Sequence, residues 1–370
     1  MSSETRTVKA ACFCGSAKYD ITLPASNFPL KADICHCWSC RHMTGTLHLT
    51  LINMPEDWDP PKDVVDKLVP FKFSERLTQY HCNTCGSQLL AHNWKDGNDH
   101  SKGYSWDAMS GCIEKADGVF EISSHEFVGD TLDGGFADFL PAIDGKTLTR
   151  WKGWPGESDE LPVHWSSPDR QQAQPKPDDR VRARCKCGGV EFWVARASER
   201  SKNASGAWPD LLIPHHSNQQ GPGKTAWWLR DNDTKFLGGV CSCNSCRLDT
   251  GMEWIEWAFV PTVDVTLDAE GSVPYKVPFG TLKGYQSSAD VTRYFCGTCG
   301  ASTFFTSTDR PNLIDVAIGL LDSPEGARAE SWLHWRTQRL SFREDALPRA
   351  EALTLGVESG LEEYGKRRDK

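Results

Sequence analysis

The cysteines of this chain repeat in order and spacing, and this repetition constrains the fold more than any other feature of the sequence. Each half has a Cys-x-Cys pair, then a Cys-x-Cys-x-x-Cys triplet, then a Cys-x-x-Cys pair. The first set is Cys12, Cys14, Cys35, Cys37, Cys40, Cys82 and Cys85. The second set is Cys185, Cys187, Cys241, Cys243, Cys246, Cys296 and Cys299. Only Cys112 belongs to neither set, so a duplicated unit explains the pattern far better than chance.

The repeat extends beyond the cysteines. Residues 35–45 face residues 241–251 at a constant offset of 206, and this register continues without a gap to Pro55 and Pro261. Cys112 has no counterpart and is expected to be a small buried side chain. The chain is therefore predicted to be a tandem of two copies of one domain.

The composition between and within the copies predicts the domain organisation. We expect a first domain over residues 1–165, a polar, proline-bearing linker over 166–180, a second domain over 181–350 and a tail over 351–370. The second copy carries an insertion at about residues 196–238. This insertion is either a loop that covers a site or a surface decoration.

Short strands dominate the expected secondary structure, so the predicted fold class is mainly β. Residues 181–194, 254–260 and 301–306 are rich in Val, Phe, Trp and Thr, which is typical of strands. Helical periodicity is weak, and short helices are expected only at residues 63–68 and from Pro348 onward.

Charge and targeting signals exclude several classes of partner. The net charge is −9, the wrong sign for a protein that lies along nucleic acid or anionic lipid, so we expect no nucleic-acid and no membrane partner. The N-terminus lacks the apolar run of a signal peptide, and no stretch is long and apolar enough to span a membrane. The 15 cysteines then fit a reducing compartment, and the predicted location is cytoplasmic.

In each copy, the Cys-x-Cys and Cys-x-x-Cys pairs together supply four sulfurs. Zinc prefers four tetrahedral ligands and is well served by paired cysteines on tight turns. The sequence therefore predicts one closed, structural zinc site per copy, which would contribute folding free energy.

The Cys-x-Cys-x-x-Cys triplet supplies only three sulfurs. Three protein ligands and an open position are typical of catalytic zinc sites. Two alternatives stay open: a histidine or a further cysteine closes the site, or the thiols carry no metal. Since a thiol bound to zinc ionises readily and stays nucleophilic, an open site would favour the addition of a small thiol to a carbonyl carbon, or the reverse elimination.

The pattern Cys-x-Cys, Cys-x-Cys-x-x-Cys-Arg-x-x-Thr-Gly and Cys-x-x-Cys-Gly resembles the family of glutathione-dependent formaldehyde-activating enzymes, which includes centromere protein V. The resemblance covers most of each half and implies a zinc-binding β-tent fold for each copy, with carbon–sulfur lyase chemistry. It implies structural zinc on Cys12, Cys14, Cys82 and Cys85, and on Cys185, Cys187, Cys296 and Cys299. It implies catalytic zinc on Cys35, Cys37 and Cys40, and on Cys241, Cys243 and Cys246.

Other residues near the triplets are weaker candidates for substrate binding. Arg41 and Arg247 would either pair with a substrate carboxylate or offset the charge of the thiolates. His36 and His48 are candidate proton carriers, but Ser242 and Trp254 replace them in the second copy, which favours structural roles. His48 and Trp254 are kept as candidate substrate contacts.

The predicted function is a zinc-dependent carbon–sulfur lyase-like enzyme that handles a thiol adduct of a small carbonyl compound. It would hold up to four zinc ions and take glutathione as a possible co-substrate. The tandem, the insertion and the aromatic residues of the second copy indicate a substrate other than formaldehyde. One alternative is a zinc-dependent dehydratase or hydrolase that acts on a larger metabolite, and the other is a non-catalytic zinc scaffold that binds a protein. The oligomeric state is not predicted.

Overall fold

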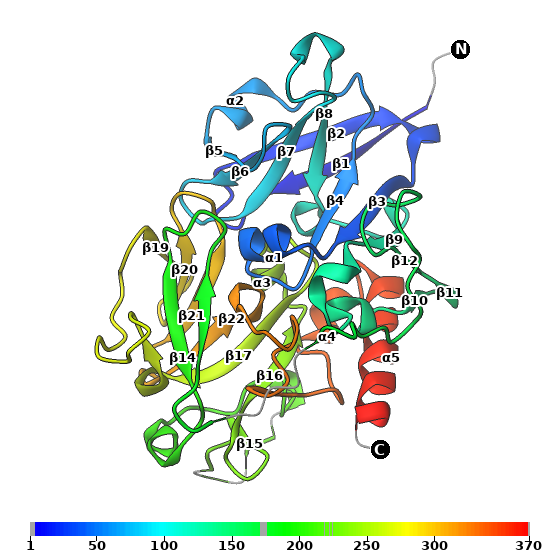
Figure 1. Cartoon of the computed structure of the whole chain (residues 1–370). Coiled ribbons are helices and arrows are strands. Elements are labelled where there is room, and N and C mark those ends of the chain that lie inside the picture. The colour runs from blue at the N-terminus through cyan, green and yellow to red at the C-terminus, as the bar shows by residue number, and fades with distance from the viewer. Residues whose placement is uncertain (1–3, 171–175, 218, 222, 224, 369–370) are drawn as a thin grey trace.

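The computed structural model describes residues 4–170, 176–217, 219–221, 223 and 225–368. Strands dominate, and each half of the chain forms one eight-stranded sheet, seen in the upper and lower parts of Figure 1. The prediction of a mainly β tandem is therefore confirmed. Residues 171–175 of the predicted linker and residues 218, 222 and 224 of the predicted insertion lie outside the described residues, and the domain bounds stay a prediction.

Six neighbouring strands have the same order in the two sheets, which differ at one edge. The first sheet runs β12 (Thr149–Arg150), β9 (Phe120–Glu126), β3 (Leu30–Cys35), β4 (Leu49–Asn53), β8 (Tyr104–Met109), β7 (Gln88–Trp94), β6 (Leu77–Cys82) and β5 (Leu68–Lys72). The second runs β15 (Leu229–Arg230), β16 (Lys235–Cys241), β17 (Ile255–Pro261), β22 (Leu313–Ala317), β21 (Ser302–Ser307), β20 (Val291–Cys296) and β19 (Leu282–Gln286), with β23 (Leu333–Trp335) beside β16. Each cysteine triplet therefore starts at the same strand end.

A hairpin precedes each sheet and carries the first cysteine pair on its turn. The first hairpin is β1 (Thr5–Ala11) and β2 (Lys18–Pro24), whose buried and exposed residues alternate as in a half-buried strand. The second is β13 (Arg180–Arg184) and β14 (Glu191–Ala195), to which β18 (Val265–Thr266) adds a strand. A small hairpin of β10 (Ala142–Ile143) and β11 (Lys146–Thr147) completes the first half.

Two matching helices, α1 (Trp38–Thr44) and α3 (Asn244–Thr250), follow the first cysteines of the triplets. Each is N-capped by a cysteine sulfur and ends at a left-handed glycine, Gly45 at φ 84° and Gly251 at φ 77°. Neither helix was predicted from the sequence. The short helices α2 (Lys62–Val65) and α4 (Arg343–Ala346) each form a single turn.

The two halves meet through these helices, which lie near the centre of Figure 1. Helix α1 packs against the second half at a 3₁₀ turn, Ile318–Leu320, and α3 packs against the first half at the matching turn, Ser110–Cys112. Two backbone hydrogen bonds join them, from the N–H of Gly319 to Gly45 O at 3.0 Å and from Gly111 to Gly251 O at 2.8 Å. Each half therefore contributes one helix that packs on the matching turn of the other half.

Helix α5 (Glu351–Arg368) is longer than the short helix expected there and packs on the first half. Its Tyr364 ring lies 5.1 Å from the ring of Phe139, and Gly360 sits against the Phe139 carbonyl. Among the described residues, no helix is both long and apolar enough to cross a membrane.

Candidate functional site

Each half brings one four-cysteine cluster together at the hairpin turn. Cys12 and Cys14 follow β1, whereas Cys82 ends β6 and Cys85 lies on the next turn. The Sγ atoms of Cys14 and Cys82 are 3.7 Å apart, and those of Cys187 and Cys296 in the second half are 3.5 Å apart. Sulfurs at the corners of a zinc tetrahedron with bonds of about 2.3 Å are separated by about 3.8 Å. Both four-sulfur clusters therefore fit zinc.

Each three-cysteine cluster forms where a strand enters a helix. Cys35 ends β3, Cys37 caps α1 through a hydrogen bond from the Cys40 amide at 3.3 Å, and Cys40 lies in the first helical turn. In the second half, Cys243 caps α3 in the same way, with the Cys246 amide at 3.2 Å. In both clusters the sulfurs lie within 4.8 Å of one another, so three thiolates could hold one ion.

The crowding of these thiols favours ionisation of one sulfur per cluster. Hydrogen bonds from the thiols of Cys35 and Cys40 lower the pKa of Cys37 to about 3. In the second half, thiol hydrogen bonds from Cys241 and Cys243 hold the pKa of Cys246 well below its usual value. Thiolate is the form in which cysteine ligates a metal, so both clusters have the chemistry of a zinc donor set.

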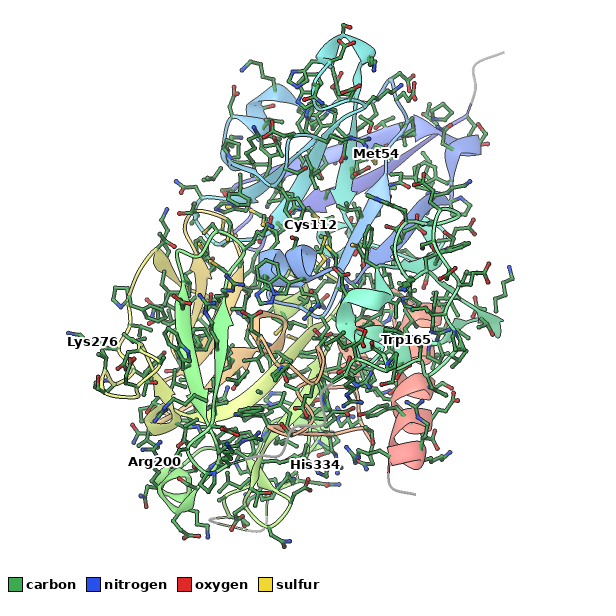
Figure 2. The ribbon with its side chains drawn as sticks, in the orientation of Figure 1. Met54, Cys112, Trp165, Arg200, Lys276 and His334 are labelled. Carbon is green, nitrogen blue, oxygen red and sulfur yellow. The ribbon has the colours of Figure 1, made fainter. Side chains whose placement is uncertain are left out.

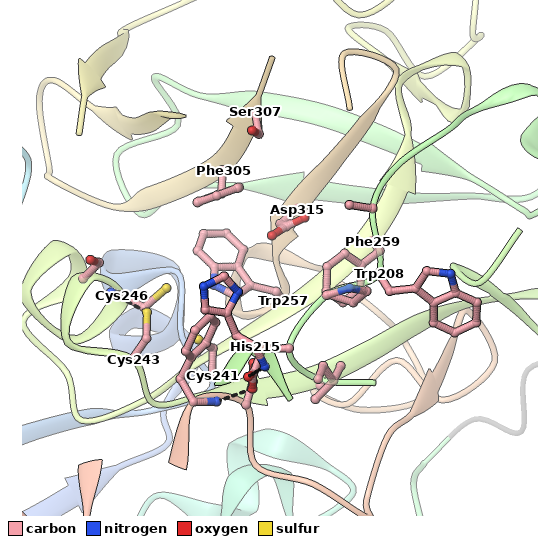
Figure 3. Close-up of a pocket in the computed structure, with 18 of the residues that line it drawn as sticks. Trp208, His215, Cys241, Cys243, Cys246, Trp257, Phe259, Phe305, Ser307 and Asp315 are labelled. Atoms are coloured by element: carbon pink, nitrogen blue, oxygen red, sulfur yellow. Dashed lines mark hydrogen bonds between the residues drawn. The ribbon is translucent and has the colours of Figure 1, made fainter. Parts of the chain in front are cut away.

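The second three-cysteine cluster opens into a cavity of about 500 Å³ (Figure 3). Cys241, Cys243 and Cys246 all line this cavity. Its other walls come from the second sheet and from the predicted insertion, and include Trp208, His215, Trp257, Phe259 and Phe305. A substrate could therefore reach the sulfurs from a chamber with aromatic walls.

A buried arginine accompanies this cluster. Nη1 of Arg293 on β20 lies 3.5 Å from Cys246 Sγ and 3.7 Å from the carboxylate of Asp249 on α3. The arginine and aspartate side chains are only 5% and 3% exposed. Arg293 thus partly offsets the charge that metal-binding thiolates would place in a buried site.

One aspartate anchors the insertion over the cavity. The fully buried Asp210 carboxylate accepts hydrogen bonds from Arg339, at 2.9 and 3.1 Å, and from the amides of His215 and Phe342, at 2.7 and 2.6 Å. The region after β23 and the insertion are therefore fixed to each other beside Cys241. This part of the insertion lines the cavity, and its role as the cover of a site stays a prediction.

The arginines predicted as substrate contacts are committed to backbone carbonyls. Arg41 Nε donates to His36 O at 3.2 Å, and Arg247 Nη1 donates to Ile113 O at 3.1 Å and to Gly111 O. Both side chains are buried. A role for either in substrate binding stays a prediction.

The histidines predicted near the triplet lie in the interior. His36 Nε2 is 2.8 Å from His125 Nδ1, and the His48 ring lies 5.6 Å from Trp254 of the other half and 4.7 Å from Phe136. Burial lowers the pKa of His48 to about 3, so this imidazole is uncharged at neutral pH. His48 and Trp254 thus meet each other between the halves, while any contact with substrate stays a prediction.

Cys112 lies where the two halves meet (Figure 2). It is 2% exposed and donates to Gln88 O at 3.0 Å, and burial raises its pKa to about 12. These features agree with the buried side chain predicted from the sequence.

Arg293, Asp249 and Asp210 were not predicted from the sequence. The repeat contains a signal for the first two. Arg293 pairs with Phe305 in the second sheet, and Gln79 pairs with Ala91 at the same place in the first sheet, so Arg293 and Gln79 occupy matching positions. The matching positions of the first half hold Gln79 and Met43, so a charged pair is specific to the second copy. Asp210 lies in the insertion and has no counterpart to compare.

Comparison with known proteins gives one family. The glutathione-dependent formaldehyde-activating enzyme family matches residues 7–122 and 231–338. The first match contains all seven cysteines of the first set, and the second begins at residue 231, within the predicted insertion, and so leaves out Cys185 and Cys187. No curated protein matches the chain. Since the two segments together cover more than half of the sequence, the chain belongs to the glutathione-dependent formaldehyde-activating enzyme family.

Proposed function

We propose that this protein is a zinc-dependent carbon–sulfur lyase-like enzyme that handles a thiol adduct of a carbonyl compound, with glutathione as the candidate thiol. Family membership supports glutathione-linked chemistry, and the four cysteine clusters support metal binding. The observation that carries the proposal is the cavity of about 500 Å³ that all three cysteines of the second triplet line. We therefore assign the reaction to the second half.

Zinc on three thiolates would supply Lewis acidity and lower the pKa of an incoming thiol. In the direction of synthesis, a carbon–sulfur bond forms as the carbonyl π bond breaks, and the thiol proton passes to the carbonyl oxygen; the reverse reaction restores both. Trp257 and Phe259 exclude water from the reacting atoms, and Arg293 holds the negative charge at Cys246.

A zinc-dependent dehydratase or hydrolase that acts on a larger metabolite is the second candidate. The volume and aromatic walls of the cavity favour it, because formaldehyde would fill only a small part of this space.

The matching cysteines of the two halves provide the test. Cys246→Ser should abolish glutathione-dependent aldehyde turnover and remove about one zinc per chain, whereas Cys40→Ser should remove one zinc and leave most of the turnover. Turnover that survives in the Cys246→Ser protein would refute the assignment. Hydrolysis or dehydration without glutathione, lost in the same variant, would favour the second candidate.

We also propose a cytoplasmic location and a small-molecule substrate without a nucleic-acid partner. The 15 free thiols and the net charge of −9 support this assignment. We retain the domain bounds predicted from the sequence, 1–165 and 181–350, as part of the proposal.

A further inference from the structure

The walls of the second-half cavity are aromatic because two strands direct alternate side chains into it. Trp257 and Phe259 are two residues apart on β17 and therefore share a face of the sheet, and Phe305 lies nearby on β21. Figure 3 shows Trp257 and Phe305 around the same cavity as the three cysteines. A flat ring attached one carbon from a metal-bound sulfur would meet these walls.

The matching positions of the first half carry no such rings. The strand registers match Trp257 with Leu51, Phe259 with Asn53 and Phe305 with Ala91. The residue opposite this last pair of positions is an aspartate in both copies. Asp315 lies opposite Phe305, and Asp107 lies opposite Ala91. The aromatic walls therefore belong to the second copy alone and are not a requirement of the fold.

The charges around the aromatic walls disfavour an anionic group on the carbonyl component of the adduct. Both arginines in the described lining of the cavity are engaged, since Arg310 binds Asp315 at 2.8 Å and Arg293 lies against Asp249 and Cys246. Each of these two guanidiniums lies 5.1 Å from the centre of the Phe305 ring. The lining also contains four carboxylates, on Asp210, Asp309, Asp315 and Asp345, together with His215 and the three cysteines. Asp210 is paired with Arg339 and Asp315 with Arg310, so Asp309 and Asp345 add negative charge that these arginines do not balance. A carboxylate on the carbonyl compound would therefore enter a chamber with more negative than positive groups.

We propose that the second half selects an uncharged aromatic carbonyl compound, whose ring occupies the space between Trp257, Phe259 and Phe305 when its thiol adduct reaches the three cysteines. This inference rests on the proposed function and names its substrate class. An aromatic aldehyde joined to a thiol has the arrangement sulfur, carbon, ring, which benzyl mercaptan reproduces in a stable molecule.

Thiol binding to the cobalt-substituted full-length protein tests the proposal without turnover. Sulfur-to-cobalt charge-transfer absorption would be titrated with benzyl mercaptan, ethanethiol and 4-(mercaptomethyl)benzoic acid, and Cys246→Ser would assign the signal to the second half. We expect benzyl mercaptan to bind about tenfold more tightly than each of the other two thiols. Equal binding of ethanethiol would overturn the aromatic selection, and tighter binding of the carboxylate would overturn the charge argument. If no thiol changes the spectrum, the proposed function itself fails.

Variants of the aromatic wall give the second test. Phe305→Ala should cost benzyl mercaptan about tenfold in affinity and leave ethanethiol unchanged, whereas Phe305→Leu, which keeps most of the apolar side chain and its packing, should cost less. Leu51→Ala alters a matching wall position of the first half and should change neither affinity. Equal losses for both thiols in Phe305→Ala, or no loss for benzyl mercaptan, would contradict the proposal.

Discussion

The amide of Gly319 donates to the carbonyl of Gly45 at 3.0 Å, so the two halves touch backbone to backbone. A Cβ added at Gly319 would lie 2.1 Å from the carbonyl oxygen of Thr46. The contact therefore leaves no room for a side chain at the junction.

Gly319→Ala should destabilise the protein by about 1–3 kcal/mol, because one half must shift away from the other. Urea unfolding measures this cost. Gly238→Ala is the matched control, since this buried strand glycine has its nearest neighbour at 3.5 Å, an ordinary van der Waals contact. A loss of the same size in both variants would show that the junction is not the cause.

The charged pair beside Cys246 should strengthen metal binding in the second half. Replacing Arg293 and Asp249 by the first-half residues, as Arg293→Gln with Asp249→Met, removes both charges and leaves no unpaired buried ion. We expect the second three-cysteine site to lose about 10–100-fold in zinc affinity, the usual effect of removing a group that supports metal ligands.

Competition with a chromophoric chelator would measure this loss, with Cys40→Ser and Cys246→Ser backgrounds to separate the two three-cysteine sites. The first-half site should keep its affinity in the double variant. Unchanged affinity at the second site would rule out a supporting role for the pair.

Glu256 should make stability depend on pH. This fully buried carboxyl accepts from the Leu47 amide at 2.7 Å, and burial raises its pKa from 4.5 to about 7. Between those values the folded protein keeps a proton that the unfolded chain releases, so the free energy of unfolding falls as the pH rises towards 7 and levels off above it.

Glu256→Gln keeps an acceptor for Leu47 and removes the titration. From pH 6 to pH 8.5, the parent should lose about 1 kcal/mol more stability than this variant, measured by urea unfolding at both values. Parallel pH profiles for the two proteins would contradict the assignment.

The cysteine clusters could be predicted because ligand chemistry fixes their spacing. Paired sulfurs on a short turn are recognisable in sequence whatever surrounds them, and Cys12, Cys14, Cys82 and Cys85 come together as expected. The strand prediction for residues 254–260 also agrees with β17, Ile255–Pro261, because its residues have high strand propensity.

Helices α1 and α3 could not be predicted from periodicity, because seven residues complete only about two turns. Their starts depend on Cys37 and Cys243 as N-caps, and cysteine is not among the residues preferred at that position. The meeting of His48 with Trp254 was equally hidden, since it depends on which faces of the two halves pack together.

The pocket depends on pairings between residues far apart in the chain. Asp210 and Arg339 belong to segments separated by most of the second sheet, and no local pattern links them. The contrast between Trp257 and Leu51 was available in the repeat, but only the strand register shows that both positions face a three-cysteine cluster.

The return of α5 to the first half sets an order for folding during synthesis. Phe139 is fully buried, and its ring is covered by Trp335 at 5.0 Å and by Tyr364 at 5.1 Å. A ribosome needs on the order of ten to fifty seconds to reach these residues after it has made Phe139. The first half therefore leaves the ribosome with an apolar surface that is covered only when residues near the end of the chain have been made. During that interval this surface is open to a chaperone or to a neighbouring nascent chain.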